Sequence, residues 1–173
     1  MKRFLLAFWQ IENHIRNYIA VARWVHLRFP VLGRFVFLLM DRFMLILYGI
    51  DMKGTSINVA ALSIAHSVGV LLGGNGIFSP GRVAIMAGVK FVARSPNDED
   101  YLRRQKLGRV FELGDNVVIG ANSVIIGPVC ICDNVIIGAM SLVNKDINEP
   151  GVYVGVPVKR ISGVVTDEWV NHF

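Results

Sequence analysis

The chain has few side chains that could hold a metal ion or form a disulfide. It contains two cysteines, Cys130 and Cys132, and four histidines. The cysteines are too close together for an ordinary structural disulfide and lack the companion ligands of a zinc site. Only His66 falls in the repetitive part of the sequence described below, so three clustered histidines cannot be assembled there. The composition therefore predicts free thiols, a cytoplasmic location and a function without a metal.

The sequence also lacks a secretory signal and an unbroken membrane-spanning run. The apolar stretch near the start, Phe4 to Trp9, is too short for a signal peptide. The stretch Val31 to Ile50 is long enough to cross a bilayer, but Arg34, Asp41 and Arg42 interrupt it. Their spacing places these charges on one face of a helix, with a wide apolar arc opposite. We expect a helix that packs on the rest of the molecule, on other copies of the chain, or on a bilayer surface.

Basic side chains are concentrated at the start of the chain. Residues 1–50 carry seven basic and two acidic side chains, a net charge of +5 (7 − 2) that equals the formal charge of the whole chain. The basic side chains alternate with phenylalanine, leucine and tryptophan, which favours an anionic membrane surface over nucleic acid as a partner. The sequence therefore predicts no nucleic-acid binding. Peripheral contact of residues 1–48 with the inner face of the cytoplasmic membrane is an alternative to their packing as a cap.

What the sequence has in abundance is a six-residue repeat. Aliphatic side chains recur on one phase at Leu113, Ile119, Ile125, Ile131, Ile137 and Val143. Four residues after each comes a small or β-branched side chain, at Val117, Ser123, Val129, Val135, Ser141 and Ile147. A short fixed period is typical of a solenoid, and a period of six indicates a β-helix. The fold is therefore predicted to be mainly β.

A looser block of the same repeat precedes the regular one. It places Ala65, Leu71, Ile77, Val83 and Val89 on one phase, and the fourth residue after each is mostly small. Small residues at that position fit a tight corner between two flat faces of a β-helix. The block extends the predicted solenoid back toward Gly49.

The segments outside the repeat complete the predicted organisation. Residues 1–48 are expected to form two or three helices with a break at Pro30 and Gly33. Residues 49–165 form the β-helix, and residues 93–112, which obey no period, form a polar loop that projects from one corner. Such loops often line a binding face, although a merely solvated loop is an equal alternative. Residues 166–173 are expected to form a terminal cap.

Several segments resemble the hexapeptide-repeat acyltransferases. The stretch Ala65 to Gly73 (AHSVGVLLG) is similar to the catalytic-histidine segment of serine acetyltransferases. Gly114 to Gly127, Asp133 to Ser141 and Gly155 to Lys159 (GVPVK) resemble the C-terminal coils of that family. The resemblance implies a left-handed parallel β-helix that assembles as a homotrimer. It also implies that acetyl-coenzyme A binds between chains and donates an acetyl group.

The same resemblance assigns the catalytic residues. His66 would act as the general base on an acceptor hydroxyl, and Asp51, fifteen residues (66 − 51) earlier, would orient its imidazole. Because the repeat phase slips around Ile57 to Ser63, a surface aspartate unrelated to the histidine is the alternative.

The family also implies a cofactor site and a substrate contact. Gly120, Ala121, Gly138 and Ala139 match corners that accept the pantetheine arm of coenzyme A. Lys159 and Arg160 match positions that meet the nucleotide phosphates. Arg109 matches an arginine that contacts the acceptor in the family.

The sequence departs from the serine enzymes in three places. Ala65 replaces the aspartate that holds the substrate ammonium group, Val110 replaces a second histidine after Arg109, and the helical region before the coils is shorter. Loss of an ammonium partner penalises binding of an amino acid zwitterion. The chain in this respect resembles the related O-acetyltransferases of surface-polysaccharide assembly, which implies a sugar acceptor. Serine O-acetyltransferase activity and a non-catalytic trimeric scaffold are the alternatives.

Overall fold

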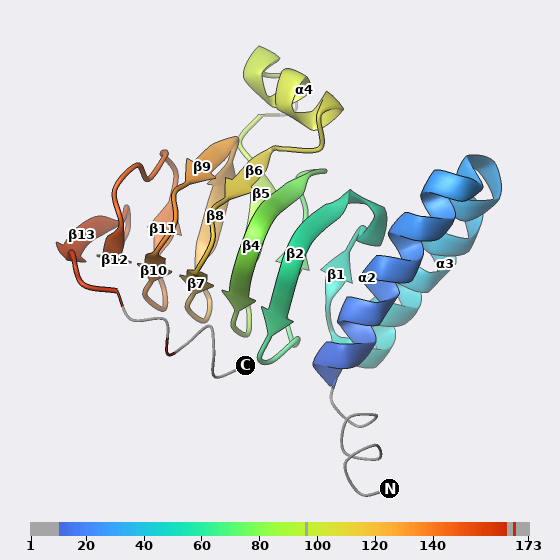
Figure 1. Cartoon of the computed structure of the whole chain (residues 1–173), viewed down its shortest axis with the longest axis horizontal. Helices are drawn as coiled ribbons and strands as arrows, with labels where there is room; N and C mark the ends of the chain where they lie inside the picture. The colour runs from blue at the N-terminus through green and yellow to red at the C-terminus, as the bar shows by residue number, and fades with distance from the viewer. Residues whose placement is uncertain (1–10, 96, 166–167, 169–173) are drawn as a thin grey trace, which may run out of the picture.

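The computed structural model describes residues 11–95, 97–165 and 168, which form a helical hairpin followed by a β-helix (Figure 1). The helices are α2 (Ile11–Arg28), α3 (Pro30–Tyr48), α4 (Glu99–Lys106) and the short 3-10 helix η1 (Gly54–Ser56). The strands are β1 (Asp51–Met52), β2 (Ile57–Ile64), β3 (Leu71–Leu72), β4 (Ile77–Ile85), β5 (Lys90–Ala93), β6 (Phe111–Leu113), β7 (Val117–Ile119), β8 (Val124–Gly127), β9 (Val129–Ile131), β10 (Val135–Ile137), β11 (Leu142–Val143), β12 (Gly151–Val154) and β13 (Lys159–Ser162).

The hairpin of α2 and α3 covers the first coil of the β-helix (Figure 1). Proline cannot donate the backbone hydrogen bond that a helix interior needs, and Pro30 accordingly stands in the first turn of α3. Gly49 ends α3 in a left-handed conformation (φ 65°) and donates its N–H to the Leu45 carbonyl oxygen. The inner faces of the two helices join the core through Tyr18 and Phe37. The break near Pro30 is where the sequence predicted it.

The outer face of α3 is apolar and exposed. Val31, Phe35 and Ile46 expose 77 to 86% of their surface, and α2 adds the exposed Trp24 and Leu27. No helix in the part of the chain that the structure describes is long and apolar enough to cross a membrane. Peripheral membrane contact of this face stays a prediction.

Parallel strands stack from coil to coil, as the repeat predicts. Val117 pairs with Val135, and Ile119 with Ile137, so residues three hexads apart lie in line. The strands form a five-stranded sheet in the order β1-β3-β5-β8-β11 and an eight-stranded sheet that bends at a corner within β4. Both sets of hexad residues from Leu113 to Ile147 are buried. The predicted β-helix is therefore confirmed.

The phase predicted for the looser block is wrong at its start. Ala65 and Leu71 are only half-buried, and the core is filled instead by Ile64, Val70 and Leu72. The reason is that the first two coils are longer than the rest. Pairing in the five-stranded sheet advances by 20 residues (72 − 52) and then 19 (91 − 72), but by 18 (143 − 125) in the regular coils. A register shift in β2 between Val59 and Ala61 takes up part of the excess.

The segment predicted as a loop contains the helix α4, which projects from the β-helix (Figure 1). Asp98 caps α4, because its carboxylate accepts a hydrogen bond from the Tyr101 backbone N–H at 2.9 Å. The strands around the segment keep their register, since Ala93 pairs with Gly127 and Phe111 with Val129. The excursion therefore leaves and rejoins the coil without disturbing its stacking.

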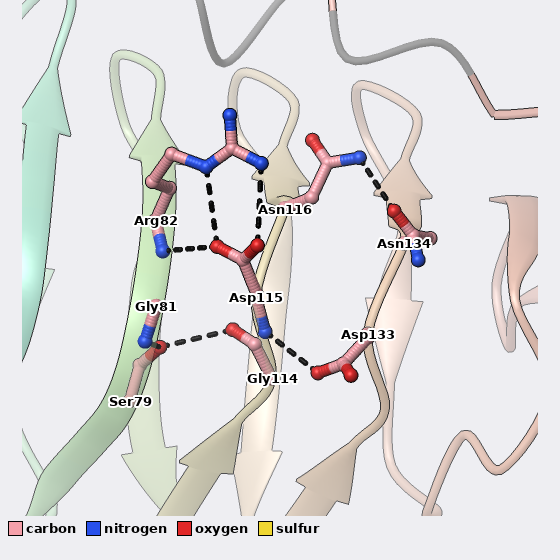
Figure 2. Close-up of polar contacts among 8 residues, drawn as sticks. All are labelled: Ser79, Gly81, Arg82, Gly114, Asp115, Asn116, Asp133 and Asn134. Carbon is pink, nitrogen blue, oxygen red and sulfur yellow. Dashed lines mark hydrogen bonds and ion pairs between the residues drawn. The ribbon is translucent and has the colours of Figure 1, made fainter.

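Polar side chains line up along the corner between β4, β6 and β7, where Figure 2 shows them. Arg82 donates to both carboxylate oxygens of Asp115, each at 3.2 Å, and this ion pair lowers the pKa of Asp115 to about 2. One coil further on, the Asn116 amide donates to Asn134 at 2.7 Å. Both asparagines have positive φ (57° and 58°), the left-handed conformation that asparagine tolerates at a tight corner. These contacts tie three successive coils together.

The last coil ends in a strand of opposite direction. β13 runs antiparallel to β12, and the backbone of Gly155 and Val158 bonds to Leu142 of β11. The cap predicted for residues 166–173 lies outside the described residues, apart from Glu168.

Candidate active site

His66 and the predicted coenzyme A positions lie on one edge of the β-helix. We call it the His66 edge; it consists of the turns after β2, β4, β7 and β10, at residues 65–69, 86–88, 120–122 and 138–140. These turns form one row beyond the arrowheads of the four strands (Figure 1). Ile64, Ile85, Ile119 and Ile137 pair in succession, which places Ala121 and Ala139 in register with His66. Residues 55 and 73 positions after His66 are thus brought onto the same line by the stacking of coils.

Backbone contacts on both sides hold the turn that carries His66. The Ala65 N–H donates to the Ile85 carbonyl oxygen at 3.0 Å, and the Gly69 N–H donates to the Gly49 carbonyl oxygen at 2.9 Å. The buried Ser67 hydroxyl donates to the Tyr48 carbonyl oxygen at 2.6 Å. The His66 side chain itself is exposed. A fixed backbone with an exposed imidazole suits a group that must meet a substrate.

Asp51 lies near the same edge, on the next face of the β-helix. Its backbone N–H donates to the Val70 carbonyl oxygen at 2.9 Å, and it pairs with Leu71, which follows the His66 turn. Its carboxylate is exposed and lines a pocket between α3 and the first coil. The contacts of the described residues include no hydrogen bond between Asp51 and His66. Their action as a dyad stays a prediction.

The two basic residues predicted to meet phosphate differ in their surroundings. Arg160 donates to the Pro150 carbonyl oxygen through Nε (2.9 Å) and Nη2 (2.6 Å), and it forms an ion pair with Glu149 at 3.1 Å. Lys159 pairs with Val154, beside the turn that continues the His66 edge, and it is exposed. Lys159 is thus the better placed of the two for a phosphate, because the guanidinium of Arg160 is already engaged.

Arg109 does not lie with His66 in one chain. It follows α4, and its guanidinium lies 4.1 Å from the centre of the Phe78 ring and 3.9 Å from the Glu112 carboxylate. Its segment is on the opposite side of the β-helix from the His66 edge in Figure 1. Arg109 can serve the site that contains His66 only if a second chain supplies it.

A pocket of about 670 Å³ beside Asp51 was missed by the sequence analysis. Its walls are α2, α3 and the start of the first two coils, and three basic side chains, Arg34, Arg42 and Lys53, line it. The pocket joins segments far apart in the sequence, so no local motif marks it. The signal available was the pair of arginines on one face of the predicted helix.

A metal site is not among the features of this surface. Within residues 11–95, 97–165 and 168, no group of three or more histidine, cysteine, aspartate or glutamate side chains could hold a metal ion.

Comparison with known proteins identifies the repeat and the fold. Residues 112–145 match the model of the bacterial transferase hexapeptide family (six repeats). No curated protein matches the sequence. The chain is thus a hexapeptide-repeat protein with a left-handed β-helix, as the resemblance implied.

Within that class the fold is the one seen in serine acetyltransferases. The Neisseria gonorrhoeae enzyme is 24% identical, with a TM-score of 0.73 over 94% of this chain and 59% of that one. The Brucella abortus enzyme in complex with coenzyme A is 20% identical, with a TM-score of 0.74 over 90% of this chain and 58% of that one. The soybean enzyme complexed with serine is 23% identical, with a TM-score of 0.68 over 86% and 58%. The chain therefore spans under two thirds of the length of these enzymes, and its likeness to the polysaccharide enzymes stays a prediction.

Proposed function

We propose that the protein is an acetyl-coenzyme A-dependent O-acetyltransferase. The observation that carries the proposal is the register of His66 with Ala121 and Ala139 along the His66 edge. A general base and the predicted cofactor positions thus share one line on a fold that a coenzyme A complex of a serine acetyltransferase also has.

In this proposal His66 takes the proton of an acceptor hydroxyl as the oxygen attacks the thioester carbonyl carbon. The tetrahedral intermediate collapses, the carbon–sulfur bond breaks, and His66 returns the proton to the thiolate of coenzyme A. Asp51 accepts from the other imidazole nitrogen and thereby fixes the tautomer. Transfer is direct, without an acyl-enzyme.

The corners of the regular coils supply the cofactor surface. A side chain at Gly120 would meet the Ala139 backbone nitrogen at 2.6 Å, and one at Gly138 would meet Val154 at 2.6 Å. These glycines are therefore required by the stacking of coils, and the neighbouring alanines keep the edge low enough for a pantetheine arm. Lys159 meets the nucleotide phosphates at the far end of the same edge.

The decisive measurement is thiol release from acetyl-coenzyme A with a panel of sugars and serine. His66→Ala should lower the rate by about 10²–10⁴, the usual worth of a general base, while calorimetry shows unchanged coenzyme A binding. Val68→Ala, an exposed substitution two residues away in the same turn, is the matched control. A His66→Ala enzyme as fast as the wild type would contradict the mechanism. A protein that fails to bind acetyl-coenzyme A would be the scaffold instead.

The acceptor we propose is a sugar hydroxyl of a surface polysaccharide or its precursor. Ala65 offers no carboxylate beside His66 for an ammonium group, which disfavours an amino acid zwitterion. Free serine is the second candidate, because similar solved structures are serine acetyltransferases in complex with serine. Turnover of serine above that of every sugar tested would decide for the second candidate.

The assembly we propose is a homotrimer, in which a neighbouring chain brings Arg109 to the His66 edge. Sedimentation equilibrium should give three times the monomer mass of 19.2 kDa. A monomeric mass together with full activity would overturn this arrangement.

A further inference from the structure

The pocket between α3 and the first coil has a wall of unpaired cations. Arg34 and Arg42 lie eight residues apart on α3, and Lys53 follows β1 on the opposite wall. All three are exposed, and none has a hydrogen bond or ion pair with another described residue. The Nδ1 atom of His26, a fourth lining residue, is buried and lacks a partner among the described residues.

The two acidic side chains of the pocket do not neutralise this wall. Asp41 is held by the fold: its Oδ1 accepts from the Tyr18 hydroxyl at 2.6 Å and from the Gly54 N–H at 3.0 Å. Burial, followed by this contact with Asp41, raises the pKa of Tyr18, so the hydroxyl stays a donor. Asp51 is left as the one exposed carboxylate at the rim, on the side of the His66 edge.

The pocket lies on the opposite side of His66 from the predicted cofactor positions. Its β-helix wall comes from the first two coils, at residues 51–56 and 71–75. Ala121 and Ala139 lie in later coils, in the other direction along the edge. Coenzyme A laid along the later coils leaves this pocket to the second substrate.

We infer that the pocket binds an anionic group, a phosphate or a carboxylate, carried by the acceptor, and that Arg34 and Arg42 are its main contacts. The inference rests on the proposed function and narrows its acceptor class to acidic hydroxyl compounds, such as a sugar phosphate or a uronic acid. Guanidinium groups match both anions geometrically, because they donate two parallel hydrogen bonds. The buried Nδ1 of His26 offers a further polar contact at the pocket wall.

Binding can be measured without turnover, on the full-length protein and without acetyl-coenzyme A. Calorimetry with glucose 1-phosphate, glucuronate and glucose should show binding of at least one acidic sugar and none of glucose. The double variant Arg34→Ala/Arg42→Ala should weaken that binding at least about tenfold. Arg28→Ala removes an exposed arginine from the hairpin outside the pocket and should leave it unchanged.

The two acidic sugars separate the sources of charge. A preference for glucose 1-phosphate assigns a phosphate-bearing acceptor, and a preference for glucuronate assigns an acidic sugar. Equal binding of glucose and both acidic sugars, or unaltered binding by the double variant, would overturn the inference.

Failure of the inference and failure of the proposed function look different. His66→Ala should retain binding of the acidic sugar, since His66 does not line the pocket. If His66→Ala abolishes thiol release but the arginine variant binds normally, the function stands and the anion pocket is wrong. If the arginine variant loses binding but no thiol is released by any protein tested, the pocket stands and the function is wrong.

Discussion

The first two coils and the regular coils of the β-helix are built differently. From Phe111 onward each coil takes 18 residues, and side chains repeat their contacts from one coil to the next, as the Asn116–Asn134 pair does. The first two coils take 20 and 19 residues and contain a 3-10 helix and a register shift. They also carry His66, Asp51 and the cationic pocket. Regular stacking sets a fixed line of positions, and the added residues make room for reactive groups at one end of that line.

The largest effect that separates the two regions should come from deleting matched core side chains. Ile64, in the first coil, and Ile131, in a regular coil, each expose 3% of their surface. Truncation to alanine should cost either protein about 2–5 kcal/mol of unfolding free energy, measured in urea. Only Ile64→Ala should also slow thiol release in the folded protein, because Ile64 ends the strand that positions His66. Equal slowing by Ile131→Ala would erase the distinction between the regions.

Two buried serines test whether the regions are stabilised equally. Ser79 donates to the Gly114 carbonyl oxygen and accepts from the Gly81 N–H; Ser123 donates to the Gly138 carbonyl oxygen and accepts from the Ser141 N–H. Replacing either by alanine leaves two backbone groups without a partner, at a cost of about 1–3 kcal/mol. Similar losses in urea unfolding are expected. A cost confined to Ser123→Ala would mean that the early coils are held together by other contacts.

The smallest effect concerns the ion pair between Arg82 in the second coil and Asp115 in the third. Arg82 holds the folded pKa of Asp115 at about 2, below its ordinary 3.8. The stabilisation is therefore present above about pH 4 and is lost as the pH falls toward 2. Because the Asp115 side chain is 47% exposed, solvent screens the pair, and Asp115→Asn should cost under about 1 kcal/mol at pH 7.

Urea unfolding of wild type and Asp115→Asn between pH 7 and pH 2 measures this, and the difference should shrink across that window. Asp133→Asn, at a carboxylate that accepts a backbone N–H in the next coil, is the matched control. A difference that is constant with pH would show that the charge of Asp115 contributes nothing.

The repeat made the fold predictable, because core residues recur at equal steps wherever a coil has 18 residues. The same rule misplaced the core at Ala65 and Leu71, since residues added in β2 and η1 shift the phase without leaving a periodic trace. Helix α4 escaped prediction because its eight residues bury only Tyr101, so there is no apolar stripe to detect. Its cap, Asp98, was the available signal.

The site was predictable in part for a similar reason. His66 and the alanines of the later corners could be located, since they fall on turns that the repeat defines. The cationic pocket could not, because it arises where α3 crosses the outer face of β1 and β3. Contact between a helix and a sheet depends on packing, which no short sequence pattern encodes.

The closed ends of the β-helix determine how copies of the chain can meet. Helices α2 and α3 cover the first coil, and at the other end β13 and the backbone of Gly155 and Val158 occupy the edges of β12 and β11. The exposed side of β13 carries Lys159 and Arg160, charges that repel an incoming strand of the same kind. Growth of end-to-end filaments by strand addition is thereby disfavoured. Self-association is directed to the flanks of the prism, which is where a site shared between neighbouring chains would have to form.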